Sequence, residues 1–303
     1  MITANETELR FDERTLNDFA ASLTLSPHSI VSYKKCLAYF FSYLVEKGID
    51  KPESSHVSAY YGELKASGRK GNTVYNYMAA VRAFFRWAQS QGLYHDISAN
   101  ITVPHADQSS ARGALTAAQL RKLMNSIDRD TLQGLRDYAI LALMLTAGLS
   151  ALELSRADVG DVCEESDGYV IHIRDNNGQR RDRAKIPPYA IEAVTKYLEA
   201  RGVAGAGDAY GEAVPLFVSV SDRNRDKNQH MTVGSISRVA KNALRDAGFD
   251  DARLSAQSLK VSAMRLALQS GERLEDVQKF ARHKHIRTTF LYERPALEGA
   301  YPA

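Results

Sequence analysis

The sequence predicts a mainly helical protein of two domains with one small antiparallel sheet. Apolar residues recur with the spacing of a helix along most of the chain, and strict alternation replaces that spacing only at Tyr169–Arg174. The chain has 303 residues, which is too long for one small module and fits two ordinary domains. These two observations set the fold class.

The first third of the chain is predicted to be an all-helical bundle. Its second segment begins at Ser26-Pro27, where a proline suits the first helical turn, and stops at Gly48. Successive amphipathic segments joined by short connections are typical of a bundle, and here they are Thr15–Ala21, Ser26–Gly48, His56–Ala66 and Thr73–Gln91.

A polar stretch separates this bundle from the rest of the chain. Pro104–Arg112 is rich in Ser, Asp and Pro and has no apolar periodicity. We interpret residues 104–112 as a linker between a first domain over residues 1–103 and a second domain over residues 113–303.

The second domain is predicted to be helical around one hairpin. Thr116–Gln119 reads as a capping box that starts a helix, and Arg136–Thr146 as a buried helix. The alternating run Tyr169–Arg174 and the run Arg183–Pro187 flank an Asn-Asn-Gly turn, as in a hairpin. Further helices are expected at Tyr189–Arg201, Val233–Ala247, Ser258–Ser270, Leu274–Arg282 and Arg287–Glu293.

Composition and motifs exclude several classes of protein. With 44% hydrophobic and 25% charged residues, the chain is neither disordered nor collagen-like. Cys36 and Cys163 lie in unrelated contexts, so we expect no disulfide framework, no metal site and no cofactor. The N-terminus has no secretory signal, and the longest apolar run, Tyr138–Leu149, is too short to span a bilayer. We therefore expect a cytoplasmic protein with no membrane partner and no small-molecule substrate.

Clusters of basic residues are more informative than the net charge of +3, which permits binding to nucleic acid without indicating it. A solvated face balanced by acids explains any one cluster. Clusters spread over both domains favour contact with a phosphate backbone, and the candidate DNA-binding residues are Lys34, Lys35, Lys70, Arg82, Arg86, Arg180, Arg181, Lys185, Arg238 and Lys241.

Several segments together resemble the tyrosine site-specific recombinases, the phage integrase family. The first domain is similar to that family's core-binding, SAM-like domain, and its segments 26–35 and 71–88 resemble the two helices that face DNA there. The second domain resembles the family's catalytic domain in the order of its boxes, which are Thr146–Leu154, the hairpin, Leu254–Lys260, Val277–His283 and Ile286–Tyr292.

The resemblance implies a chemistry of DNA strand exchange without a metal. In this family a tyrosine attacks the scissile phosphate, which leaves a 3′-phosphotyrosyl link and a free 5′-hydroxyl before rejoining. Charge develops on the phosphate oxygens and needs cationic side chains to stabilise it. The family's set is Arg, Lys, His, Arg, a His or Trp, and the Tyr.

Only two of these six positions are retained in this sequence. His283 and the nucleophile position Tyr292 match. Elsewhere Ser150 stands for the first Arg, Gln257 for the His and Lys260 for the second Arg. Ser150 is equally well explained as a helix N-cap.

The sixth position, the Lys of the hairpin turn, is also substituted. Asn176 occupies it in a gapless alignment and Gln179 in a shifted one, and Asn176 is a common turn residue in any case. Losing one preorganised donor typically costs on the order of 10²–10³ in rate, so the combined losses would reach roughly 10⁴ or more.

These observations leave three hypotheses for the function. The first is a DNA-binding member of the family that clamps duplex DNA and is catalytically impaired or inactive, either alone or beside an active relative, in effect associated with the bacterial nucleoid. The second is an active recombinase with a rearranged site that attacks through Tyr292. The third is a helical interaction module without DNA binding. The tail Arg294–Ala303 resembles a segment that docks onto a neighbouring subunit, or is a frayed terminus.

Overall fold

The computed structural model describes residues 9–104, 113–175, 178–203, 214–220 and 229–292. The chain divides into two compact units, Met1–Ser110 and Ala111–Ala303, each of which we describe by itself. Most of the predicted linker, together with the tail Arg294–Ala303, lies outside the described residues.

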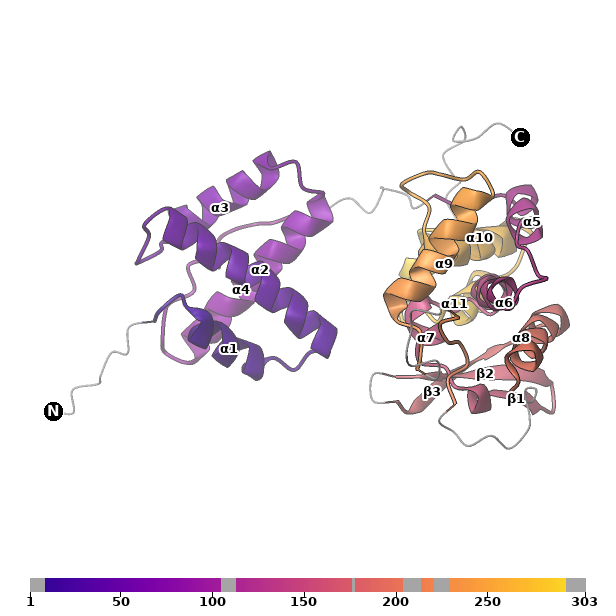
Figure 1. Ribbon diagram of the computed structural model, residues 1–303. Coiled ribbons are helices and arrows are strands. Elements are labelled where there is room, and N and C mark those ends of the chain that lie inside the picture. The colour runs from indigo at the N-terminus through magenta and orange to yellow at the C-terminus, as the bar shows by residue number, and fades with distance from the viewer. Residues whose placement is uncertain (1–8, 105–112, 176–177, 204–213, 221–228, 293–303) are drawn as a thin grey trace. The chain divides into compact units, whose positions relative to one another are not determined.

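The first unit consists of four helices around an aromatic core (Figure 1). The long helices α2 and α4 pack against each other, and the rings of Phe40, Phe84 and Phe85 are fully buried between the helices. Side-chain caps fix where α1 and α2 begin, because Asp12 and Ser26 accept bonds from backbone N–H groups of the first turn. The predicted bundle is thus confirmed, with bounds α1 Glu13–Ser22, α2 Pro27–Glu46, α3 Ser54–Ala66 and α4 Gly71–Ser90.

The second unit is built around one buried helix, α6, which contacts α8, α9 and α10. Almost every side of α6 is apolar, so neighbouring helices cover it all round. The capping box at Thr116 is present and starts α5. The helices are α5 Ala117–Asn125, α6 Leu132–Thr146, α7 Ala151–Leu154, α8 Pro188–Arg201, α9 Val233–Asp246, α10 Ala256–Gln269, α11 Leu274–Ala281 and α12 Ile286–Phe290.

An antiparallel sheet of three strands, in the order β1-β2-β3, completes the second unit. The predicted hairpin corresponds to β2 (Gly168–Arg174) and β3 (Arg180–Lys185). The second strand begins earlier than predicted, because its charged residues pair with acids instead of alternating with apolar ones. The edge strand β1 (Val162–Glu165) was not predicted, since four residues with two acids give no strand pattern.

A buried carboxylate attaches the sheet to the chain before it. Asp161 ends a short 3₁₀ turn, Val159–Asp161, and its side chain is fully buried. Both of its oxygens accept bonds from Arg174 of β2, and one also accepts a bond from Arg180 of β3. Because a buried carboxylate without partners is costly, these arginines hold the hairpin in a fixed place.

The mainly helical fold class with one small antiparallel sheet is therefore confirmed. Within the described ranges, no helix is long and apolar enough to span a bilayer.

Candidate active site

Three segments of the second unit bring five of the six sequence-predicted site residues into one region. Ser150 and Gln257 line one surface pocket of about 660 Å³ between α7, α9 and the start of α10. Lys260, three residues further along α10, interacts electrostatically with Glu153 of α7 and with Arg282. His283 in turn interacts with Lys260 and stacks on Tyr292. Asn176 lies outside the described residues, and the alternative Gln179 is exposed beside the turn.

Ser150 serves as the N-cap of α7. Its hydroxyl accepts a hydrogen bond from the Glu153 backbone N–H at 3.2 Å, and the Glu153 carboxylate accepts one from the Ser150 N–H at 2.6 Å. This reciprocal capping box is the structural explanation that the sequence left open. Ser150, which the sequence analysis aligned with the family's first arginine, is therefore a neutral hydroxyl that the backbone already uses.

An arginine that the sequence analysis did not single out lies beside this cap. Arg282, at the end of α11, donates from Nε and Nη2 to the two oxygens of Glu153, each at 3.0 Å. Its remaining donors reach the carbonyls of Ala147, Gly148 and Phe280 at 2.6–3.1 Å. A guanidinium has five N–H groups, and every one of them is bonded within the protein.

The backbone of Arg282 adopts a left-handed conformation, which is strained for a residue with a side chain. Its φ of 55° makes it the only non-glycine residue in the left-handed region among the residues described. Gly148, which accepts one of its bonds, leaves no room for a side chain, since a Cβ there would lie 2.9 Å from the Phe280 carbonyl oxygen. The contacts of Arg282 thus join the turn between α6 and α7 to the end of α11 at close range. No pattern of spacing in the sequence marks this role.

Lys260 is an ammonium group buried in the site. The residue is 7% exposed, and the described residues give its Nζ no hydrogen-bond partner. Burial, followed by the nearby charge of Arg282, lowers its pKa to about 8, although Glu153 acts in the opposite direction. Lys260 therefore offers a positive charge to an incoming anion, but a smaller and less directional one than an arginine.

His283 and Tyr292 are held by the last turn of the described chain. A hydrogen bond of 2.9 Å joins His283 Nδ1 to the hydroxyl of Thr289, which is fully buried. Burial, then the charges of Lys260 and Arg282, lower the pKa of His283, which favours the neutral imidazole. The ring of Tyr292 stacks on it with centroids 5.8 Å apart and packs on the small apolar cluster of α10 and α11.

A second arginine missed by the sequence analysis, Arg265 of α10, lies near Tyr292. Its Nε is buried and has no hydrogen-bond partner among the described residues, which is an uncommon state for a guanidinium. Burial lowers the pKa of Arg265, and its interaction with Tyr292 partly offsets that effect. An arginine between Met264 and Leu266 in an otherwise apolar run is the sequence signal that could have identified it.

The candidate DNA-binding residues of β3 are engaged with acids. Arg180 bonds to buried Asp161, Arg181 pairs with Asp175, and Lys185 pairs with Asp167. Arg181 and Lys185 nonetheless remain well exposed, at 62% and 71%. Arg180 is thereby a structural residue of the sheet, whereas the other two can still reach solvent.

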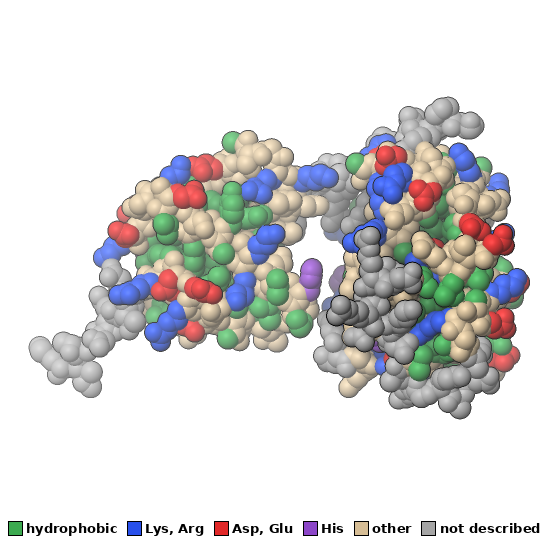
Figure 2. Space-filling model, viewed as in Figure 1, with side chains coloured by type: hydrophobic (Ala, Val, Ile, Leu, Met, Phe, Trp, Pro, Cys, Tyr) green, Lys and Arg blue, Asp and Glu red, His purple; other side chains and the backbone are tan. Residues whose placement is uncertain are grey.

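The candidate DNA-binding residues on the helices are mostly without acidic partners. Lys34 donates to Asn17, Arg86 to a backbone carbonyl, and Lys241 to the Asp251 carbonyl with Asp250 3.8 Å away. Positive and negative side chains are interspersed on the visible face of each unit (Figure 2). Candidates for which the described residues provide no ion pair are Lys34, Lys35, Lys70, Arg82, Arg86 and Arg238.

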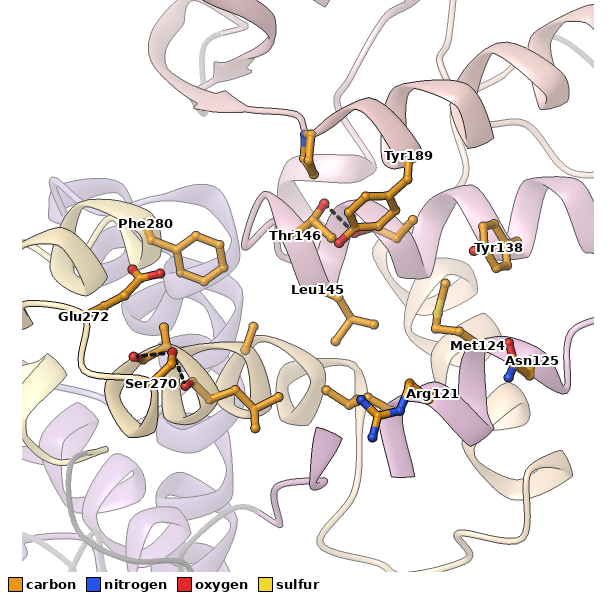
Figure 3. Close-up of a pocket in the computed structure, with 16 residues that line it drawn as sticks. Arg121, Met124, Asn125, Tyr138, Leu145, Thr146, Tyr189, Ser270, Glu272 and Phe280 are labelled. Atoms are coloured by element: carbon orange, nitrogen blue, oxygen red, sulfur yellow. Dashed lines mark hydrogen bonds between the residues drawn. The ribbon is translucent and has the colours of Figure 1, made fainter. Parts of the chain in front are cut away.

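The second unit also contains an apolar pocket of about 670 Å³ away from these cations. Tyr138, Leu145 and Tyr189 point toward it together with Phe280 of α11 (Figure 3). Few charged groups line it, so it offers no constellation for acid–base or nucleophilic chemistry.

Comparison with known families identifies the chain. Residues 16–92 match the model of the phage integrase N-terminal SAM-like domain, and residues 114–298 match that of the phage integrase family. The chain belongs to the phage integrase family. The resemblance noted in the sequence is thereby confirmed.

Relatives and solved structures agree with this assignment. The chain is 27% identical to "Tyrosine recombinase XerD" of Listeria monocytogenes serotype 4b over 281 residues, which cover 88% of each protein. It is 28% identical to "Tyrosine recombinase XerC" of Corynebacterium efficiens, with 78% of this chain and 72% of that one covered.

Two solved structures share the fold at low sequence identity. One is the XerH site-specific recombinase bound to palindromic difH substrate, with a TM-score of 0.71, 17% identity, and coverage of 89% of this chain and 77% of that one. The other is a lambda integrase (75–356) dimer bound to a COC′ core site, with a TM-score of 0.70, 14% identity, and coverage of 96% and 98%.

Replacing Arg282 by alanine will destabilise the second unit. Loss of the guanidinium leaves the mostly buried Glu153 carboxylate without its counter-ion, and we expect the free energy of unfolding to fall by about 3 kcal/mol. Urea unfolding followed by far-ultraviolet circular dichroism measures this. Fluorescence of Trp87, the single tryptophan, reports the first unit and should not change. Exposed Arg287→Ala is the control, and equal stability of both variants would contradict the role of Arg282.

Replacing Lys260 by methionine will stabilise the second unit in a pH-dependent way. The pKa of Lys260 is about 8 when folded and 10.5 ordinarily, so between these values the unfolded chain binds more protons and the lysine's cost diminishes as pH rises. We expect Lys260→Met to add about 3 kcal/mol near pH 7 and far less near pH 10. Urea titrations at both pH values, with exposed Lys284→Met as control, measure this. An equal gain in stability at both pH values would contradict the claim that Lys260 is buried as a charged group at pH 7.

Proposed function

We propose that this protein binds duplex DNA as a member of the tyrosine recombinase family and is catalytically impaired. The observation that carries the proposal is that the arginine found in the site has no donor left for a phosphate. All five N–H groups of Arg282 are bonded within the protein, and the family's arginine positions hold the capping residue Ser150 and the buried Lys260. The fold and its exposed cations are retained while the charge for catalysis is rearranged.

Support for DNA binding comes from cations on the helices of the first unit. Arg82, which is half-buried, and Arg86, which is exposed, are four residues apart on α4 and share a face, and Lys35 is exposed on α2. Cations without acidic partners can exchange their counterions for phosphates, which is the sequence-independent part of DNA affinity. The two solved structures described above, a recombinase and an integrase that share this fold, are bound to a difH substrate and to a COC′ core site. Duplex DNA is accordingly the proposed partner, bound by this chain alone, with a second copy, or with an active relative.

Support for impaired catalysis comes from the loss of bidentate cations. An arginine holds two phosphate oxygens with a planar fork, whereas a lysine offers a point charge. Gln257 can donate a hydrogen bond but cannot transfer a proton, and Ser150 is neutral. Together these substitutions remove several stabilising contacts to the transition state, each worth on the order of 10²–10³ in rate.

A second candidate function is slow strand cleavage by a rearranged site. One observation favours it: Lys260 has a pKa of about 8, which is close to the working pH that suits a general acid. Arg265, whose buried Nε has no hydrogen-bond partner in the described structure, adds a cation near Tyr292. In this reaction the Tyr292 phenol would lose its proton to solvent as its oxygen attacks the phosphorus. The bond to the 5′-oxygen would break, and the Lys260 ammonium would protonate that oxygen.

Binding to random-sequence duplex DNA should weaken as salt increases. Each phosphate contact contributes a slope of about −0.9 in log affinity against log salt, so Arg82→Ala with Arg86→Ala should flatten the slope by nearly two units. Fluorescence anisotropy measures this. Lys47→Ala, whose ammonium pairs with Glu63, is the matched control on the same unit. Binding without salt dependence, or no binding, would instead favour a protein-interaction module.

Covalent trapping on DNA separates the two candidate functions. Nicked duplexes selected for binding from a random pool prevent rejoining, so any attack by Tyr292 accumulates as a protein–DNA adduct on a denaturing gel. We expect no adduct above the level of Tyr292→Phe over hours. An adduct that requires Tyr292 would refute the impairment, and its loss in Lys260→Met would assign the acid.

A further inference from the structure

Pairing of β1 with β2 brings three side chains of metal-ligand type together outside the candidate active site. The side chains of Cys163, Glu165 and His172 each offer one ligand atom, and these atoms all lie within 4.8 Å of one another. His172 Nε2 lies 3.7 Å from a carboxylate oxygen of Glu165. All three residues are half-buried, so the group is neither a solvated surface cluster nor part of the apolar core.

The register of the sheet explains why these residues meet. Cys163 lies opposite Val170, and Glu165 lies opposite Gly168. Residues directly opposite each other, and those two apart on one strand, share a face of the sheet, so Cys163, Glu165 and His172 all project from the same face. Along the strands, Cys163 stands midway between the other two, and Gly168 places no side chain in the way of Glu165.

We infer that Cys163, Glu165 and His172 form a binding site for a zinc-class divalent cation. One thiolate, one imidazole and one carboxylate are a mixed ligand set that zinc accepts in tetrahedral geometry, with bonds of about 2.0–2.3 Å. Ligand atoms on one tetrahedral centre lie roughly 3.3–3.8 Å apart at such bond lengths, so small side-chain adjustments close the site. Three protein ligands leave the fourth position open to water.

The surroundings support ligation instead of a simple ion pair. Arg183, opposite His172 on β3, contacts the second oxygen of Glu165 and leaves the first oxygen toward His172. An outer partner of this kind orients a ligating carboxylate.

A metal here would fasten the unpredicted edge strand to the hairpin. β1 has only four residues and is paired on one side, with β2. Ligands from two strands close a short loop, so bound metal would stabilise the second unit without touching the candidate active site.

Cobalt(II) is the probe for the test, because a thiolate ligand gives it a sulfur-to-metal charge-transfer band and tetrahedral geometry intensifies its visible bands. Cobalt(II) chloride is titrated into the reduced full-length protein, and zinc chloride is then added. We expect a charge-transfer band that saturates at one equivalent and disappears when zinc displaces the cobalt.

Variants identify the ligands. Cys163→Ser should abolish the band, and His172→Gln should weaken cobalt binding about tenfold or more. Cys36→Ser is the matched control, because Cys36 is buried in the first unit and should leave the spectrum unchanged. Circular dichroism confirms folding of each variant. Absence of the band in the native protein, or a band that survives in Cys163→Ser, would overturn the proposal. Neither readout involves DNA, so the test of the metal site is independent of the test of the proposed function.

Discussion

The candidate active site depends on one ion pair, between Arg282 and Glu153. Glu153 caps α7 through the Ser150 N–H, and Arg282 fastens that cap to the end of α11, directly before His283. Because the guanidinium also binds three backbone carbonyls, it joins the turn between α6 and α7 to the end of α11. Its charge further lowers the pKa values of Lys260 and His283. One residue therefore sets both the shape of the site and its electrostatics.

In this arrangement the residue that stabilises the site, Arg282, is different from the residues that could bind a phosphate. An arginine whose donors are all engaged stabilises structure, but it cannot also present a fork to a ligand. Among the described residues of this site, the cations with donors still available are Lys260, which is buried and easily deprotonated, and Arg265 near Tyr292. Affinity for the DNA backbone requires exposed charge spread over a surface, whereas cleavage requires a few charges in fixed places. The proposed function follows because the protein keeps exposed positive charge for DNA binding and lacks the fixed charges that cleavage requires.

The sequence predicts the helices well because each carries its own periodicity, and the caps at Ser26, Thr116 and Ser150 follow from local chemistry. It does not predict contacts that depend on pairing between distant segments. Arg282 and Glu153 are 129 residues apart, and no spacing rule connects them. Cys163 and His172 appear unrelated until β1 is known to pair with β2, and a four-residue strand with two acids has no recognisable pattern.

The central claim of the proposed function is that Arg282 is bonded where an arginine expected at position 150 would have to lie, because the Ser150 N–H and Arg282 Nη2 both bond to Oε2 of Glu153 and two like charges so close repel. Two restored variants that differ only at residue 282 test this directly in the adduct assay. Both carry Gln257→His, Lys260→Arg, Asn176→Lys and Ser150→Arg, and one adds Arg282→Gly, which also suits the left-handed backbone there. We predict that only the variant with Arg282→Gly forms a Tyr292-dependent adduct. Equal adduct formation by the variant that keeps Arg282 would contradict the account.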